Sequence, residues 1–356
     1  MSDSRKEAEK KMAKAIFISG DCWLCVFDLL PPRQLGLGIA MISHRFDFYV
    51  DEHFKTRKWA LKFIQIRRKI AKNGTKNMEI FNFYQKPMPI PEIQLPRKVI
   101  GFKSIRIFYI DRNAIAFLRR FRQLFASSPI NLAISTFSVR ILKLIVHNIW
   151  PMIVKNICGV KLSPGTFRRF RKFAPSFLSD FTSLRVVNLC AADFFMEFPA
   201  DDSAAASDGQ TLAKWLFTPF PNNVPKMLKC LLDMSHGNLA SRIEAFKTAF
   251  ANASPANFIV VIWSSFPFSD FVPFDLINGF THEQLTLKIK PNSHRFLLVR
   301  CPIVRNASKW AKWEEAVIGW RIDNQWNQID IEIYGDDDMG EGLLDTTPGP
   351  NDQQQK

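Results

Sequence analysis

The chain lacks the sequence motifs that mark common enzyme active sites. It contains no HExxH, GxSxG or GxGxxG pattern and no phosphate-binding loop, so nothing local supports metal-dependent hydrolysis, acyl transfer or nucleotide binding. Its six histidines are scattered, and no two of them are four residues apart. Cys22 and Cys25 have the spacing of half a zinc site, but no second pair accompanies them. We therefore expect a protein that is not an enzyme and that needs no metal or cofactor.

The sequence also lacks a long apolar run. No stretch reaches the roughly 18 apolar residues that a membrane-spanning helix needs. The first residues, MSDSRKEAEKKMAKA, are charged and lack the apolar core and cleavage site of a secretory signal peptide. The six cysteines lie mostly in apolar strings, which is typical of reduced, buried thiols. These features predict a cytoplasmic or nuclear protein without a membrane partner.

The composition indicates a substantial folded core. Of the 356 residues, 47% are hydrophobic and 33 are phenylalanine, enough for two domains with many aromatic contacts. The net charge is +15, although the last segment, from Gly335 onward, is acidic. Such a charge favours attraction to nucleic acid or to acidic proteins without choosing between them.

The stretch from Ile18 to Trp59 carries more apolar surface than so short a segment can bury alone. Three short helices are expected there: one with Asp21 as its N-cap that ends at Pro31-Pro32, one from Gln34 to Ser43, and one from His44 onward. Helical spacing gathers these apolar residues on one face of each helix: Trp23, Val26, Phe27 and Leu30; Leu35, Ile39 and Ile42; Phe46, Val50 and Phe54. About forty residues cannot form a self-sufficient core, so either a partner or the rest of the chain must cover the surplus.

This stretch resembles an F-box, the helical module through which ubiquitin-ligase adaptors hold the Skp-family linker of a cullin–RING complex. The resemblance is carried by Val26-Phe27 as the apolar pair, Leu30 at the end of the first helix, Leu35, and the element Ile42-Ser43-His44-Arg45-Phe46. Ile18-Ser19 replaces the usual Leu-Pro opening, and the gap from Leu30 to Phe46 is about one residue longer than usual. The sequence of this stretch is similar to those of the large nematode F-box families.

The resemblance implies a substrate receptor of an SCF-type cullin–RING ubiquitin ligase. Such a receptor would bind the linker through its F-box and an unknown target protein through the rest of the chain. The implied linker-binding residues are Ile18, Trp23, Leu24, Val26, Phe27, Leu30, Pro32, Leu35, Ile42, Ser43 and Phe46.

After Val99 the sequence alternates between expected strands and expected helices. Strand centres near Ile105, Leu132, Val160 and Val187 recur every 27 or 28 residues, the spacing of a strand-plus-helix repeat. A hairpin of QLTLKIK and RFLLVRC, a helix over Ser308 to Trp320 and a last strand QIDIEIY follow. The predicted fold class is α/β: a small three-helix F-box module, then an irregular leucine-rich-repeat-like β/α solenoid or curved sheet.

Five segments are expected along the chain. They are a basic disordered arm (1–15), the F-box module (16–58), a strand, turn and proline-rich connector (59–98), the α/β target-recognition domain (99–334) and an acidic disordered tail (335–356).

A long loop over residues 191–210 interrupts the repeat. Phe194, Phe195 and Phe198 stand there beside acidic residues, as in an aromatic patch that anchors a target protein. The alternative is that the loop folds its own phenylalanines back onto the core, and the sequence leaves both open.

Three basic clusters accompany the expected helices: Arg67-Arg68-Lys69, Arg119-Arg120-Arg122 and Arg168-Arg169-Arg171-Lys172. Stacked repeats would bring the second and third together. We favour a solvated surface, and nucleic acid is not a favoured partner. The alternative function is a basic nucleic-acid-associated or scaffold protein without a ubiquitin-ligase role.

Overall fold

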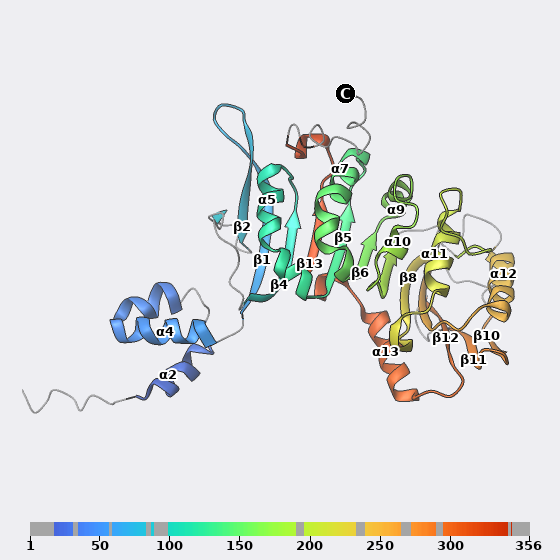
Figure 1. The fold of residues 1–356 in the computed structure, drawn as a ribbon. Coiled ribbons are helices and arrows are strands. Elements are labelled where there is room, and N and C mark those ends of the chain that lie inside the picture. Colours follow the sequence, from blue (N-terminus) through green and yellow to red (C-terminus); the bar gives the residue numbers. More distant parts are fainter. Residues whose placement is uncertain are drawn as a thin grey trace, which may run out of the picture. The chain divides into compact units, whose positions relative to one another are not determined.

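The computed structural model describes residues 18–30, 35–56, 59–82, 87–88, 99–189, 196–232, 239–264, 272–289, 295–340 and 343. The predicted arm, Pro32, Phe194, Phe195 and most of the proline-rich connector lie outside the described residues. The chain divides into two compact units: Met1–Trp59 with Pro96–Val99, and Ala60–Leu95 with Ile100–Lys356. Figure 1 labels the larger helices and many of the strands.

Short helical segments make up most of the described part of the first unit. Helix α2 spans Gly20–Phe27, and α4 spans His44–Thr56. The predicted N-cap, Asp21, is wrong: Ser19 caps α2, accepting a hydrogen bond from the Cys22 amide at 3.3 Å, and Asp21 lies in the first turn. The predicted middle helix is a π-turn, η1 (Leu35–Ile39), followed by a 3-10 turn, η2 (Ala40–Ile42), a region where two glycines weaken α-helix.

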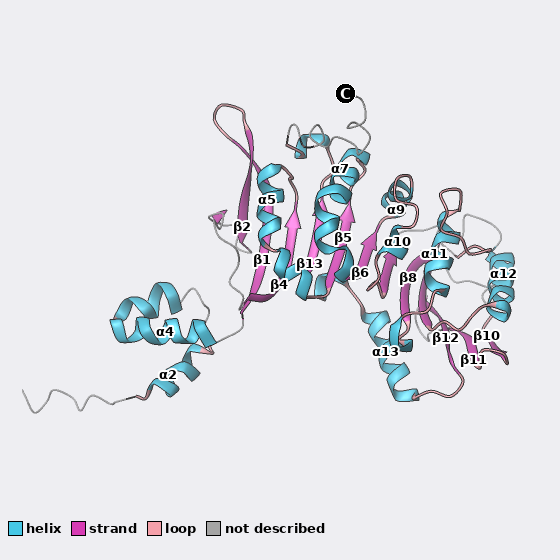
Figure 2. Cartoon of the chain, in the orientation of Figure 1, coloured by secondary structure: helices cyan, strands magenta, loops and turns pink. Residues whose placement is uncertain are grey.

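The second unit is built on one thirteen-stranded sheet (Figure 2) with the order β10-β11-β12-β9-β8-β7-β6-β5-β13-β4-β1-β2-β3. The strands are β1 (Trp59–Ile70), β2 (Lys76–Asn82), β3 (Pro87–Met88), β4 (Val99–Ile107), β5 (Ile130–Ser135), β6 (Ile157–Leu162), β7 (Val186–Leu189), β8 (Lys226–Leu232), β9 (Phe258–Ser264), β10 (Phe274–Asn278), β11 (Glu283–Ile289), β12 (Arg295–Pro302) and β13 (Gln328–Glu332). Neighbours from β4 to β9 in this order run parallel, whereas β10, β11 and β12 continue from β9 as antiparallel strands.

One buried aliphatic row crosses the sheet. In strand register the row is Ile105, Ile329, Leu132, Val160, Val187, Leu228, Val260 and Leu298, and none of these side chains is more than 2% exposed. The predicted strand centres Leu132, Val160 and Val187 are thus confirmed as direct neighbours. This row forms the middle of the hydrophobic core.

Helices cover both faces of the sheet. In Figure 1, α5 (Arg112–Arg120), α7 (Val139–Leu144) and α11 (Asp208–Phe217) lie in front of the strands. The other helical segments that connect these strands are α6 (Arg122–Ser127), η3 (Ile145–Ile149), α8 (Trp150–Ile153), η4 (Val154–Asn156), α9 (Pro164–Arg171), α10 (Phe177–Asp180), η5 (Pro221–Asn223) and α12 (Leu239–Asn252).

Helix α13 (Ala307–Gly319) packs on the opposite face. Its Trp310 and Val317 are buried in one cluster with Met227 of β8 and Ile259 of β9. The preceding residues on these strands, Lys226 and Phe258, point to the other face of the sheet, because side chains alternate along a strand. There they contact α11. The helix predicted over Ser308 to Trp320 is confirmed with slightly different ends, and Trp313 and Trp320 pack against the same cluster.

The last strand occupies an unexpected place. Sequence order predicts β13 at the end of the array, but it lies between β4 and β5, parallel to both. The run from β5 to β9 keeps the consecutive order of a repeat array, and the insertion of β13 interrupts it. The α/β class is confirmed. The predicted hairpin is also confirmed as β11 and β12, which are antiparallel, and β10 was not predicted.

The tail prediction is wrong for residues 335–340. A 3-10 turn, η7 (Asp336–Asp338), is followed by a bridge from Met339 to Ile110, and Met339 is buried. Asp337 pairs with Lys76 at 3.0 Å, and Asp338 pairs with Arg68 at 3.6 Å. Residues 335–340 are thus held by the buried Met339 and by backbone hydrogen bonds to Ile110, and the exposed ion pairs to the β1–β2 hairpin add little.

Candidate protein-docking surfaces

The first unit has a very small core. Phe27, Leu35 and Val50 are fully buried, and half-buried apolar side chains surround them. The Trp23 and Phe46 rings meet edge to face with centroids 4.8 Å apart, which ties α2 to α4.

Two polar contacts fix the ends of α2 against α4. Arg45 donates from Nη2 to the Ile18 carbonyl at 3.0 Å and from Nε to the Tyr49 hydroxyl at 3.2 Å. Gly20 lies beside this contact, and a Cβ there would lie 3.0 Å from the Tyr49 ring, so the ring would have to shift by a few tenths of an ångström. At the other end, buried His53 has its Nδ1 4.0 Å from Asp28 Oδ1 and its ring against Phe27.

The implied linker-binding residues fall into three groups. Ile18, Val26, Ile42 and Ser43 are exposed; Trp23, Leu24, Leu30 and Phe46 are half-buried; Phe27 and Leu35 are buried. The residues that the resemblance brings together therefore include both the small core and the surface around it.

Large apolar side chains on the first unit face solvent. The exposed fractions are 84% for Leu29, 79% for Met41, 63% for Ile42, 59% for Phe48 and 43% for Val26. Cys22 and Cys25 are exposed as well and form no disulfide. Val26 and Ile42 are the two of these five that the F-box resemblance implies for linker binding, and helical spacing alone does not show which apolar positions a minimal core leaves uncovered. The five side chains are called the unit 1 apolar set below.

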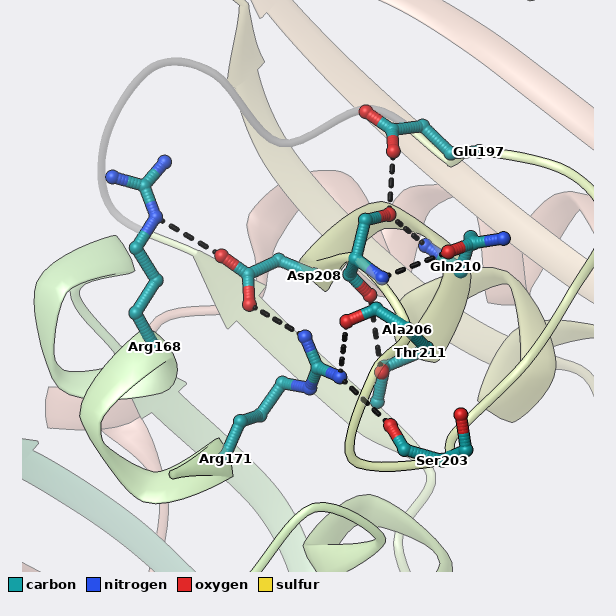
Figure 3. A network of polar contacts seen from close by, with 9 residues as sticks. Arg168, Arg171, Glu197, Ser203, Ala206, Asp208, Gln210 and Thr211 are labelled. Atoms are coloured by element: carbon teal, nitrogen blue, oxygen red, sulfur yellow. Dashed lines mark hydrogen bonds and ion pairs between the residues drawn. The ribbon is translucent and has the colours of Figure 1, made fainter.

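The second candidate surface is the loop that precedes α11 (Figure 3). Arg171 of α9 donates from Nη2 to the carbonyls of Ser203 and Ala206 at 3.1 and 2.6 Å, and from Nη1 to Asp208 at 3.0 Å. Ser207 and Gln210 form a reciprocal capping box at the start of α11. The loop is thus a packed element from residue 196 onward.

From residue 196 onward, the acidic residues of this loop have partners within the chain. Glu197 accepts a hydrogen bond from Ser207 and pairs with Arg242 at 3.3 Å. Asp202 accepts from Ser179 at 2.8 Å, and a hydrogen bond from Ser203 lowers the pKa of the Asp201 carboxyl. The expected acidic rim therefore contributes to folding rather than projecting freely.

Phe198 packs inward. Its ring meets Phe217 and Phe246 edge to face, with centroids 5.2 and 5.6 Å apart. The rest of its surface lines a groove of about 600 Å³ with Pro199, Ala245 and Ala249, between the loop, α11 and α12. Phe198 thus follows the alternative in which the loop folds its phenylalanines back onto the core. A target could bind in the groove beside it.

The basic clusters have different surroundings. Arg168 and Arg171 share Asp208 as an ion-pair partner, and Lys69 pairs with Glu79 at 2.8 Å. The α7 to α8 segment contacts both α6 and α9, so it separates the second cluster from the third. They do not form one ridge, contrary to the stacked-repeat expectation.

Comparisons of the chain with protein-family models, curated protein sequences and solved structures gave no match. Within the described ranges, no group of histidine, cysteine and carboxylate side chains has an arrangement suited to a metal ion. No helix among the described residues has the length and apolar character needed to cross a membrane.

Proposed function

We propose that this protein is the substrate receptor of an SCF-type cullin–RING ubiquitin ligase. The first unit would act as the F-box that holds a Skp-family linker, and the α/β unit would carry the target. The protein would supply proximity, and the chemistry would belong to other subunits.

One observation carries the proposal. Among the described residues of the first unit, three apolar side chains are fully buried, yet the five large side chains of the unit 1 apolar set are exposed. A linker would bury the two of them that the F-box resemblance implies, Val26 and Ile42, and the hydrophobic free energy of that burial favours the complex. The Ile42 to Phe46 element, in which Arg45 holds Ile18, supports an F-box over an unrelated helical module.

The groove beside Phe198 is the proposed place for the target. Its floor combines an aromatic ring with the small side chains of Ala245 and Ala249, which leave room for an apolar residue of a bound segment. The run of parallel strands from β5 to β9 supports a likeness of this unit to leucine-rich repeats.

Co-purification with a Skp-family linker tests the proposal. Val26→Asp and Ile42→Asp place a charge at exposed positions, so folding should persist while binding falls at least about a hundredfold. Phe48→Asp is the matched control, because it also replaces an exposed apolar side chain by a carboxylate. Phe48 is about as exposed as Ile42, and it is not among the residues that the F-box resemblance implies for linker binding. Circular dichroism and gel filtration verify that each variant is folded.

The outcomes separate the alternatives. A stoichiometric wild-type complex that survives Phe48→Asp but not the other two changes supports the receptor. A folded wild-type chain that ignores the linker contradicts it, and salt-sensitive retention on nucleic acid would then favour the basic nucleic-acid-associated protein. Linker binding with no ubiquitylated client would favour a scaffold.

A further inference from the structure

A basic pocket lies among the helical segments that connect β4 to β6, and it shares no lining residue with the groove beside Phe198. It has a volume of about 560 Å³ and is formed where α5 and α6 meet η3 and α8. Its polar lining consists of Arg119, Arg120, Arg122, Gln123, His147 and Asn148. Every polar side chain in this lining can donate a hydrogen bond, and none is a carboxylate.

The arginines of this pocket are not neutralised by described residues. No described carboxylate forms an ion pair with Arg119, Arg120 or Arg122, whereas Arg168 and Arg171, in the otherwise similar cluster on α9, both contact Asp208. The Nη1 atom of Arg120 is inaccessible to solvent and has no hydrogen-bond acceptor. The positive charge that would hold an anion is therefore that of the guanidinium groups that line the pocket, which no described carboxylate balances.

We propose that this pocket binds a phosphate ester through the three arginines. Guanidinium groups present flat pairs of donors that match the oxygens of a phosphoryl group, which is why arginine suits such sites better than lysine. The lining contains three arginines and no lysine. One pocket lined by three arginines fits a single phosphorylated group, whereas a nucleic-acid duplex would need a row of cationic sites along the surface.

The site is independent of the proposed linker surface. It lies in the second unit, and no residue of the first unit lines it. Failure of linker binding therefore leaves this proposal intact, and failure of phosphate binding leaves the receptor proposal intact.

Calorimetric titration of the full chain with sodium pyrophosphate tests the site. We expect saturable binding with one site per chain, weaker at 300 mM than at 50 mM NaCl because salt screens the charges. Arg119→Gln and Arg122→Gln should each weaken binding at least about tenfold. Arg168→Gln is the matched control, because it removes the same charge from an arginine that Asp208 already neutralises.

Two further probes identify the source of the phosphate. A pocket for a modified protein side chain should retain phosphoserine peptides over their unphosphorylated counterparts, and a pocket for a free metabolite should prefer inositol hexakisphosphate. Either preference, lost in Arg119→Gln and kept in Arg168→Gln, supports the proposal. Absence of saturable binding by all three probes overturns it, and so does an equal loss in Arg119→Gln and Arg168→Gln, which would indicate unspecific attraction to net charge.

Discussion

Arg171 of α9 reaches Asp208 in the first turn of α11, with 3.0 Å between Nη1 and Oδ1, although 37 positions separate them in the sequence. The Arg171 side chain is only 8% exposed. Asp208 also lies at a helix N-terminus, where a negative charge is favourable. One guanidinium thus fixes the preceding loop, the start of α11 and the helix that carries the arginine.

Arg171→Met should lower the free energy of unfolding by about 3 kcal/mol, because it leaves two backbone carbonyls without their donor and leaves Asp208 with the exposed Arg168 as its ion-pair partner. Urea unfolding followed by circular dichroism measures the loss. Arg168→Met is the control: its side chain is 57% exposed, and its ion pair with Asp208 should contribute at most about 1 kcal/mol. Equal losses in the two variants would refute the central role of Arg171.

Asp330 makes stability depend on pH. Burial, followed by the Glu332 carboxylate, raises the pKa of Asp330 from 3.8 to about 7, while Arg106 and Lys161 act in the opposite direction. A carboxyl whose pKa is higher in the folded state holds its proton more tightly there. The free energy of unfolding therefore falls as pH rises from about 4 to about 7.

Asp330→Asn should remove this loss, since an amide stays neutral and can still donate a hydrogen bond to Glu332. At pH 8 we expect the free energy of unfolding of the variant to exceed that of the wild type by a few kcal/mol, which is roughly what the raised pKa of Asp330 costs the folded wild type. This difference should shrink toward pH 5. Chemical unfolding at both pH values measures the difference. A constant difference would show that Asp330 does not titrate in this range.

Much of the sheet follows from local sequence patterns. Leu132, Val160 and Val187 recur at a regular interval, and the structure places them side by side. The turn at Asn73-Gly74 was also predictable, because an Asn-Gly pair favours a tight turn. In the structure Gly74 has a φ of +81°, which residues other than glycine avoid. Each of these features depends on neighbouring residues or on a short repeat.

The parts that the sequence did not reveal depend on contacts between distant segments. The alternation in QIDIEIY predicts a strand, but nothing in it specifies Ile105 and Leu132 as the neighbours of Ile329. Likewise, the sequence shows Arg171 only as one member of a basic cluster, and its ion pair with Asp208 depends on the fold. The pocket beside Arg119 contains residues that the sequence did flag, but only the structure shows which cluster lacks carboxylates.

Phe27→Ala should unfold the first unit without unfolding the second. Phe27 is fully buried in a core of three such residues, and a change of this kind costs about 3–5 kcal/mol. Hydrogen exchange should then lose protection in residues 20–56 while the strands from β5 to β9 keep theirs. Phe48→Ala, at a largely exposed ring, is the control and should leave both units protected. A simultaneous loss in both units would show that they fold as one.

The inserted strand gives the sharpest test of the fold. In a consecutive array the last strand would lie at an edge, and weakening it would affect only that end. Here Ile329 is fully buried between Ile105 and Leu132, so Ile329→Ala should cost about 3 kcal/mol and loosen the sheet on both sides of β13. Ile289→Ala, at a half-exposed position on β11, should cost about 1 kcal/mol or less. Hydrogen exchange that rises in β4 and β5 together would support the central position, whereas a rise confined to residues 328–340 would contradict it.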